Sequence, residues 1–492
     1  MAEPAFVLGI DLGTSSARAL VIDQTKGDVV ARAHSTYPLS TPQKGWAEQN
    51  PRHWWTACCQ AIKEAVKKAG LSGSDIACVG LTGQMHGLVV LDEDLKLIRP
   101  AILWNDQRTD RQCQYMHTHI GRSQLIKITG KPALTSFTAP KLLWIREHEP
   151  EAFSRIKHIL LPKDAMRLHL TGERGIDVTD ASGTSLLDIS SRTWSRDVIT
   201  ALDLDESWLP PVLESSVIAG TITREAAGET GLRAGTPVVA GAGDQAAAGI
   251  ACGINDDHVI SVNLGTSGVV FAACDGAPTD PSGSMHTFCH AVPDTCHLMG
   301  CMLSAGGSLR WYRDAFCAGM DFDAIIHEAM TVPTDCDGLT FAPYLSGERT
   351  PHNDPTLTAA FTGITAQHTR AHFSRAVLEG ILHGLRDSID LVRAVGQHPS
   401  HVRMTGGGAQ SEPWRAMAAN IFGMPVASVN ITDGSAYGVG LLAMVASGRF
   451  ESVSEAMAAC VRETSRFDPN PQQADTHANW MASTHPRRTE GT

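Results

Sequence analysis

Residues 6–16 decide the fold, and they read Phe-Val-Leu-Gly-Ile-Asp-Leu-Gly-Thr-Ser-Ser. Residues 6–10 form an apolar run typical of a short strand, and the run ends at Asp11, just before the glycine-containing turn at residues 13–15. Such a turn offers backbone N–H groups and hydroxyls to a phosphate, and its carboxylate can hold a divalent cation. The simpler alternative is an aspartate that only closes a hairpin turn.

A second turn of the same kind occurs far downstream. Residues 259–262 form another apolar run, which leads into Asn-Leu-Gly-Thr-Ser at residues 263–267. Both turns share the order Leu-Gly-Thr-Ser, so we predict one β-hairpin design that is used once in each half of the chain. Two related domains that face one nucleotide explain this repeat most simply. The repeat therefore favours the phosphate interpretation of the first turn over the hairpin-closing one.

Length and composition indicate a globular α/β protein with more than one domain. The chain has 492 residues, of which 43% are hydrophobic and 19% are charged; a single core rarely grows to that size. The formal net charge of −12 and the lack of a Lys/Arg-rich run argue against nucleic-acid binding. They do not argue against a phosphate ligand, because local N–H groups and a metal ion can override the net charge.

The cysteines and the apolar segments indicate the cellular compartment of the protein. None of the 12 cysteines belongs to a Cys-x-x-Cys pair, and most lie in apolar runs, which predicts reduced and buried thiols. No run approaches the ~20 apolar residues of a membrane span, and the N-terminus lacks a signal-like apolar core. We therefore expect a cytoplasmic protein without a membrane partner.

The pattern of the remaining chain predicts its organisation. Residues 6–34 predict a three-stranded meander, and Asn50-Pro51 is typical of a helix start. We place the domain boundary near residues 245–257, which gives an N-terminal domain over 1–248 and a C-terminal domain over 249–466. No Ser/Pro-rich linker separates them, so we expect closely hinged domains. The polar residues 467–492 predict a poorly ordered tail.

Polar groups follow several predicted strands at the point where each strand ends, which is where α/β folds place ligand contacts. These exits contain Met85 and His86, Trp104, Asp244, and three consecutive glycines at residues 406–408. Each has a structural alternative. Asp244 could cap the helix that follows, a contribution of about 1 kcal/mol, or accept a proton as a general base. His86 could be structural, and the glycines could form an empty turn that needs no ligand.

Several common sites are missing from the sequence. It contains no Gly-x-x-x-x-Gly-Lys-Ser/Thr phosphate loop and no Gly-x-Ser-x-Gly nucleophile turn. The histidines show no His-Glu-x-x-His or comparable spacing and look unclustered, so the sequence predicts no zinc site.

The quoted turns together resemble one protein family, the FGGY carbohydrate kinases, which share the fold of actin and the heat-shock ATPases. The resemblance covers about residues 6–465 and includes segments similar to both family signatures, at residues 137–144 and 361–380. It implies an α/β fold of two ribonuclease-H-like domains with an interdomain cleft that binds ATP and Mg²⁺. Such an enzyme phosphorylates a small-molecule sugar.

Within the family, three loops are similar to those of the xylulose kinases: residues 81–87, 102–106 and 343–352. They imply ATP-dependent phosphorylation of D-xylulose at O5. One departure is Gln245, since xylulose kinases often carry Asn at that position and glycerol kinases carry Gln. The Met85-His86 loop lacks the Arg-Glu pair of glycerol kinases, however. The loop Ser346–His352 has no physical explanation from sequence beyond a rigid polar loop.

The resemblance also implies roles for individual residues. Asp244 would be the general base, and Asp11 would act in catalysis through Mg²⁺. The sugar would contact Met85, His86, Trp104, Asp244 and Gln245. The nucleotide would contact Thr14, Ser15, Gly265, Thr266, Gly306, Arg310, Gly407 and Gly408.

Two other classes of protein remain open at this point. One is a kinase for a different sugar or polyol, such as ribulose, gluconate or glycerol. The other is a non-catalytic, actin-like ATP-binding protein. The sequence also leaves open whether the chain forms a homodimer.

Overall fold

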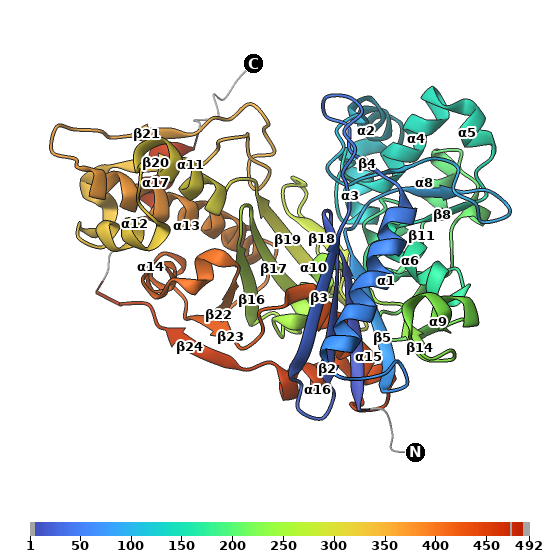
Figure 1. Cartoon of the computed structure of the whole chain (residues 1–492). Coiled ribbons are helices and arrows are strands. Elements are labelled where there is room, and N and C mark those ends of the chain that lie inside the picture. The colour runs from blue at the N-terminus through green and yellow to red at the C-terminus, as the bar shows by residue number, and fades with distance from the viewer. Residues whose placement is uncertain (1–4, 473–474, 486–492) are drawn as a thin grey trace.

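The computed structural model describes residues 5–472 and 475–485, which form two lobes with one mixed seven-stranded sheet in each (Figure 1). The first sheet has the order β13-β14-β5-β1-β2-β3, with β15 also paired to β5. Its strands are β1 (Phe6–Leu12), β2 (Ser16–Asp23), β3 (Val29–Thr36), β5 (Ile76–Gly83), β13 (Ile218–Thr221), β14 (Pro237–Val239) and β15 (Ala242–Gly243).

The second sheet has the order β18-β19-β17-β16-β22-β23-β24. Its strands are β16 (Val259–Leu264), β17 (Gly268–Asp275), β18 (His286–Cys289), β19 (Thr295–Met302), β22 (His401–Thr405), β23 (Val426–Val429) and β24 (Glu463–Phe467). Two-stranded sheets complete the lobes, and they pair β4 (Glu48–Gln49) with β7 (Ala101–Ile102), β6 (Val89–Leu91) with β8 (His158–Leu160), β9 (Ile176–Asp177) with β12 (Val212–Leu213), β10 (Leu187–Asp188) with β11 (Thr193–Trp194), and β20 (Thr340–Ala342) with β21 (Ala360–Thr362).

Helices cover both sheets and fill the space at their ends (Figure 1). Those of the first half are α1 (Pro51–Lys68), α2 (Asp110–Met116), α3 (Arg122–Thr129), α4 (Thr138–His148), α5 (Pro150–Ser154), α6 (Pro162–Thr171), α7 (Val178–Ser182), α8 (Arg196–Ala201), α9 (Arg224–Thr230) and α10 (Asp244–Ala251). Those of the second half are α11 (Gly306–Phe316), α12 (Phe322–Ala329), α13 (Arg370–Ala394), α14 (Glu412–Phe422), α15 (Gly434–Ala446), α16 (Val453–Cys460) and α17 (His477–Thr484).

The hairpin repeat predicted from sequence is present in the structure. β1 pairs antiparallel with β2, and β2 with β3, which confirms the N-terminal meander. The second turn joins β16 and β17 in the same antiparallel way. The helix start at residue 50 is also confirmed, since the Asn50 side chain accepts a hydrogen bond from the Arg52 backbone N–H at 3.0 Å. Such a cap satisfies a helix N–H group that otherwise has no partner.

One helix of the second half packs against the sheet of the first half. A Cβ atom added at Gly9 of β1 would lie 2.1 Å from the carbonyl oxygen of Ala436 in α15, and one at Gly80 of β5 would lie 2.1 Å from that of Val439. Only glycine permits this close approach of backbones. The two halves are therefore interleaved at α15, next to the strands that carry the first hairpin.

The prediction of a poorly ordered tail is wrong for residues 475–485. Helix α17 lies in this segment, and its Trp480 is buried and donates a hydrogen bond from Nε1 to the Phe341 carbonyl at 2.9 Å. Burial of one indole ring gives the segment the apolar contact that its polar composition hides. The prediction for residues 473–474 and 486–492 lies outside the described residues.

The expectation of unclustered histidines is also wrong. His352, His383, His477 and His485 lie close together around α17, although up to 133 positions separate them in the sequence (485 − 352). The cysteines behave as expected: all 12 are free thiols, eleven are buried and Cys301 is half-buried. Within the described residues, no helix has both the length and the apolar character that crossing a membrane requires.

Candidate active site

Three parallel strands of the first sheet bring the two candidate carboxylates to one edge. In the register of β1, β5 and β15, Asp11 lies beside Thr82, and Thr82 lies beside Ala242. Asp244 follows two residues later as the first residue of α10. Because the carboxyl ends of parallel strands meet at the same edge, Asp11, the loop after β5 and Asp244 form one site.

Asp11 is a buried carboxylate in which one oxygen accepts a hydrogen bond and the other has no hydrogen-bond partner among the described residues. Ser435 of α15 donates a hydrogen bond from Oγ to Oδ2 at 3.0 Å, whereas Oδ1 is buried without a hydrogen-bond partner among the described residues. Burial raises the pKa of Asp11 above its usual value. A buried and unsatisfied carboxylate oxygen costs free energy unless a ligand satisfies it. The site thus fits a divalent cation such as Mg²⁺, which prefers oxygen ligands.

Asp244 does not act as the cap of the helix that it begins. The residue at the cap position is Gly243, and no side chain makes a capping hydrogen bond there. Instead, Gln245 donates a hydrogen bond from Nε2 to Asp244 Oδ1 at 3.3 Å. Burial, and then the negative charge of Asp11, raise the pKa of Asp244 to about 7. A carboxyl group with that pKa can exchange a proton near neutral pH.

A buried polar network that sequence reasoning missed supports the backbone before Asp244. The Gly243 N–H donates to Thr179 Oγ1 at 2.8 Å, and Thr179 in turn donates to Asp177. Lys163 forms ion pairs with Asp177 at 2.9 Å and with two further buried aspartates, Asp164 and Asp180. These residues come from two short segments, 163–164 and 177–180, and carry no recognisable motif. The network fixes the position of β15 and so of the first turn of α10.

His86 is a neutral hydrogen-bonding group in a special backbone conformation. Its φ angle is 67°, its Nδ1 lies 2.9 Å from the Gly183 carbonyl oxygen, and its ring packs edge-on against Phe137. Burial lowers the pKa of His86 well below its usual value, and the charge of Lys141 lowers it further. A carbonyl oxygen only accepts, so Nδ1 carries the proton and Nε2 is an acceptor.

Met85 and Trp104, two further residues predicted to contact the sugar, lie near the same edge of the sheet. Met85 is buried against Gly243, where an added Cβ atom would lie 2.7 Å from Met85 Cγ. Trp104 is 40% exposed, and its Nε1 donates to Thr14 Oγ1 at 3.0 Å. The structure therefore joins a residue expected at the sugar to one expected at the nucleotide. Ser15, next to Thr14, is exposed.

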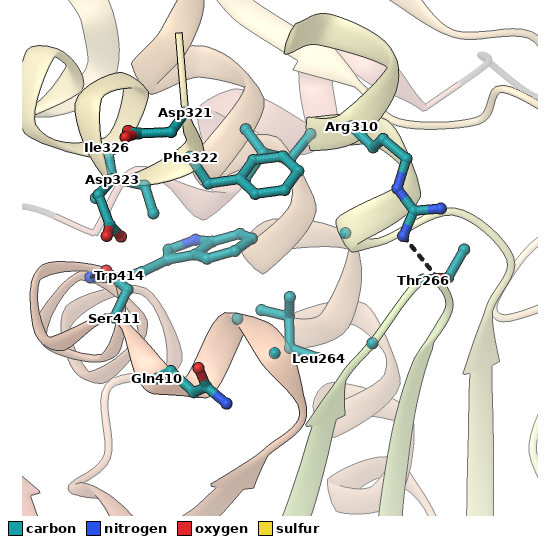
Figure 2. A pocket seen from close by; sticks show the side chains of 15 residues that line it. Leu264, Thr266, Arg310, Asp321, Phe322, Asp323, Ile326, Gln410, Ser411 and Trp414 are labelled. Carbon is teal, nitrogen blue, oxygen red and sulfur yellow. Dashed lines mark hydrogen bonds between the residues drawn. The ribbon is translucent and has the colours of Figure 1, made fainter. Parts of the chain in front are cut away.

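A cavity of about 810 Å³ lies in the second half of the chain. Six of the predicted nucleotide contacts line it, namely Gly265, Thr266, Gly306, Arg310, Gly407 and Gly408. Figure 2 shows Phe322 and Trp414 near Asp323 at one end, and Arg310 hydrogen-bonded to Thr266 at the other, with a distance of 3.5 Å. All lining residues lie between positions 264 and 414, so Thr14 and Ser15 do not belong to this cavity.

The three consecutive glycines have three different roles. Gly406 has a φ angle of 87°, and an added Cβ atom would lie 2.6 Å from the Leu264 carbonyl oxygen. At Gly408 a Cβ atom would meet Leu264 Cδ2 at 2.3 Å, so this glycine permits close packing. Gly407 faces open space, with no atom within 4 Å of an added Cβ. Only Gly407 therefore leaves backbone open to a ligand in the cavity.

The structure explains the loop at residues 346–352. Glu348 is buried, accepts hydrogen bonds from the backbone N–H groups of Leu303 at 2.9 Å and Arg349 at 2.7 Å, and burial raises its pKa to about 7. The adjacent Arg349 is near enough to the first half for its charge to contribute to the low pKa of His86. This cation comes from the second half of the chain, and sequence reasoning gave it no role.

Comparison with known proteins identifies the family of the chain. Residues 6–251 match the N-terminal domain and residues 260–447 the C-terminal domain of the FGGY family of carbohydrate kinases. The xylulose kinase of Escherichia coli is 41% identical over 91% of this chain and 91% of its own length.

Solved structures share the fold over nearly the whole chain. The xylulose kinase of Rhodospirillum rubrum is 29% identical, with a TM-score of 0.91 over 97% of both chains. The gluconate kinase of Lactobacillus acidophilus is 27% identical, with a TM-score of 0.91 over 97% of this chain and 95% of its own. The chain belongs to the FGGY family of carbohydrate kinases, built on two α/β domains of the actin and hexokinase type.

Proposed function

We propose that this kinase transfers the γ-phosphate of ATP to O5 of D-xylulose, and that Asp244 is the general base. The observation that carries this proposal is the pair of carboxylates at one sheet edge, with the pKa of Asp244 raised to about 7 beside the Met85-His86 loop. The xylulose kinase of Escherichia coli is 41% identical to this chain and the gluconate kinase of Lactobacillus acidophilus is 27% identical, which supports D-xylulose over gluconate.

The residues of the first half would hold and activate the sugar. Asp244 accepts the proton of the attacking hydroxyl. Loss of this proton increases the negative charge on the hydroxyl oxygen as that oxygen attacks phosphorus. His86 offers Nε2 as an acceptor for another sugar hydroxyl, because its Nδ1–H is directed to Gly183. Gln245 holds Asp244 in place through its 3.3 Å hydrogen bond. Trp104 presents an exposed ring that can cover one face of the sugar.

The residues of the second half would hold the nucleotide. The cavity offers an apolar surface from Leu264, Phe322 and Trp414 for the base. At its other end, the Thr266 hydroxyl and the Arg310 guanidinium suit phosphates. The open backbone at Gly407 lets the ligand lie against this wall.

Asp11 would hold Mg²⁺ at the boundary between the two sets of residues. When bound, Mg²⁺ neutralises charge on the phosphate oxygens during transfer. Asp11 can provide its unsatisfied Oδ1, while Ser435 keeps Oδ2 in place. Since α15 carries Ser435 and also packs on β1 and β5, the second half fixes the orientation of this ligand.

Closure of the two domains would complete the site. Asp11, Thr14 and Asp244 do not line the cavity of the second half, so the reacting groups must approach each other for transfer. Closure also excludes water, which would otherwise compete with the sugar hydroxyl. Arg349 on the second half is placed to meet the sugar loop on this path.

A panel of acceptors tests the proposed substrate. The purified enzyme with Mg-ATP is assayed for ADP release with D-xylulose, D-ribulose, gluconate and glycerol, and without acceptor as the control. We expect D-xylulose to give the highest kcat/KM. A higher kcat/KM for another acceptor would show that the enzyme is a kinase whose substrate is not D-xylulose. If no acceptor stimulates ADP release, the protein is better described as an actin-like ATP-binding protein.

A further inference from the structure

The histidines around α17 form a cluster that the proposed phosphotransfer does not use. His352 comes from the loop between β20 and β21, Asp387 from the middle of α13, and His485 from the residue after α17 has ended. One potential ligand atom from each of the three lies within 4.8 Å of the other two. None of them lines the large cavity.

We propose that His352, Asp387 and His485 bind a Zn²⁺ ion that fastens the C-terminal helix to the second domain. The donor set is two imidazoles and one carboxylate, which zinc accepts together with a water in a fourth position. Mg²⁺ and Ca²⁺ prefer sites made of oxygen alone. The cluster has no thiolate, so it does not suit Cu(I). No step of this inference depends on the proposed sugar.

The distances between the donor atoms suit a zinc ion. Two ligands at the usual 2.0–2.1 Å from tetrahedral zinc lie about 3.3 Å apart. His485 Nε2 and Asp387 Oδ2 are separated by 3.0 Å, and a donor nitrogen of His352 lies within 4.8 Å of the donor atoms of the other two residues. Small side-chain rotations would therefore bring the three donors around one ion.

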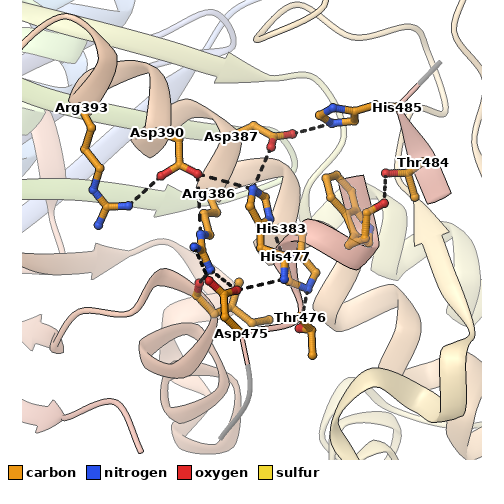
Figure 3. Close-up of polar contacts among 12 residues, drawn as sticks. His383, Arg386, Asp387, Asp390, Arg393, Asp475, Thr476, His477, Thr484 and His485 are labelled. Carbon is orange, nitrogen blue, oxygen red and sulfur yellow. Dashed lines mark hydrogen bonds and ion pairs between the residues drawn. The ribbon is translucent and has the colours of Figure 1, made fainter. Parts of the chain in front are cut away.

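Neighbouring side chains contact Asp387 and His352 and so help to orient these two proposed ligands. His477 Nε2 lies 3.2 Å from Oδ1 of Asp387, the oxygen opposite the one that His485 contacts. The Tyr344 hydroxyl lies 2.9 Å from His352 Nε2. Figure 3 shows His477 and His485 approaching Asp387 from the C-terminal segment. Outer-shell contacts of this kind fix ligand orientation in metal sites.

The location of the cluster gives the ion a structural role. The donors belong to a loop, a long buried helix and the end of the chain segment that carries Trp480. An ion that binds all three joins segments that otherwise meet through hydrogen bonds, ion pairs and the buried rings of His477 and Trp480. Binding to the folded state alone stabilises that state.

Calorimetric titration of the metal-stripped, full-length enzyme with Zn²⁺ alone tests this site. We expect one saturable site per chain in the wild type. His485→Gln and His352→Gln should each weaken Zn²⁺ binding by at least about 10- to 100-fold, the loss seen even for outer-shell partners. His398→Gln, at an exposed histidine after α13, is the matched control and should bind like the wild type.

A variant could lose Zn²⁺ binding because it is less stable, so the Tm of each protein is also measured with and without Zn²⁺. Zn²⁺ should raise the Tm of the wild type and of His398→Gln, but not that of His485→Gln or His352→Gln. The absence of a saturable site in the wild type would overturn the proposal. Equal Zn²⁺ affinity or an equal Tm shift in all four proteins would also overturn it.

Discussion

The two glycine-rich hairpins share a backbone design but differ in charge. Each has a backbone hydrogen bond within its turn. The Gly13 N–H donates to the Ser16 carbonyl at 3.0 Å, and the Gly265 N–H donates to the Ser267 carbonyl at 3.1 Å. The first carries the buried Asp11, whereas Asn263 takes the same position in the second and is exposed.

This difference explains how one turn can have two uses. A buried carboxylate attracts a cation, whereas a neutral amide does not repel an anion that binds beside it. In our account the first hairpin therefore serves the metal and the sugar side, and the second serves the nucleotide. The predictions below test this division, beginning with the largest expected effect.

Replacing Asp244 should remove most turnover if the first half carries the proton chemistry. We expect Asp244→Asn and Asp244→Ala to lower kcat by about 10²- to 10⁴-fold, the usual contribution of a positioned base. Steady-state ADP release measures this. Asp110→Asn is the matched control, because Asp110 is also the first residue of a helix. Near-normal kcat in Asp244→Asn would reduce Asp244 to a structural role.

Giving the second hairpin the charge of the first should weaken nucleotide binding. Asn263→Asp places a carboxylate beside the proposed phosphate position, and we expect the KM for ATP to rise by about tenfold through repulsion. The KM for the sugar should change much less. Asn50→Asp is the control, since aspartate caps a helix as well as asparagine does. An unchanged KM for ATP would contradict the division between the hairpins.

Removing the imidazole acceptor should affect the sugar rather than the nucleotide. His86→Asn keeps a residue that tolerates the positive φ angle of 67°. Loss of one hydrogen bond to a sugar hydroxyl should raise the sugar KM by about 3- to 10-fold. The KM for ATP is measured in the same series. Equal rises in both constants, or a loss of folded protein, would assign His86 a structural role.

Asp244→Asn should also make the metal-free protein more stable at alkaline pH. The pKa of Asp244 is about 7 in the folded protein against an ordinary value of 3.8. The folded state therefore keeps a proton that the unfolded state has lost, and stability falls as pH rises toward 7. Asparagine cannot ionise, so we expect a Tm about 2–4 °C above wild type at pH 8 and a smaller difference at pH 5.

Thermal unfolding at the two pH values checks this shift, with Asp110→Asn again as the control. A difference between Asp244→Asn and wild type that does not depend on pH would mean that the Asp244 carboxyl group does not titrate in this range. The paired location of Asp11 and Asp244 would then not produce the electrostatic coupling that we infer.

Local sequence signals predicted the elements that position the site. Apolar runs and turn glycines identified both hairpins, and Asn50-Pro51 identified the start of α1. These features depend on neighbouring residues, which is why sequence alone is sufficient for them. The residues at the strand ends were also found, because polar groups after apolar runs are visible in the sequence.

The parts that sequence could not predict depend on contacts between distant segments. Trp480 of the C-terminal segment is buried and donates a hydrogen bond to the Phe341 carbonyl, 139 residues away. Arg349 approaches His86 only after the two halves have folded. The apolar cavity surface of Phe322 and Trp414 comes from two helices with no shared motif. Tertiary packing, rather than local propensity, decides such positions.

The most direct test of the division between the two carboxylates is a Mg²⁺ titration of sugar-dependent ADP release in Asp11→Asn and Asp244→Asn, side by side with wild type. We predict that Asp11→Asn needs a higher Mg²⁺ concentration for half-maximal rate and recovers part of its activity as Mg²⁺ increases. Asp244→Asn should stay slow at every Mg²⁺ concentration, with an unchanged half-maximal point. Recovery of Asp244→Asn by Mg²⁺, or an unshifted Mg²⁺ requirement in Asp11→Asn, would contradict the account.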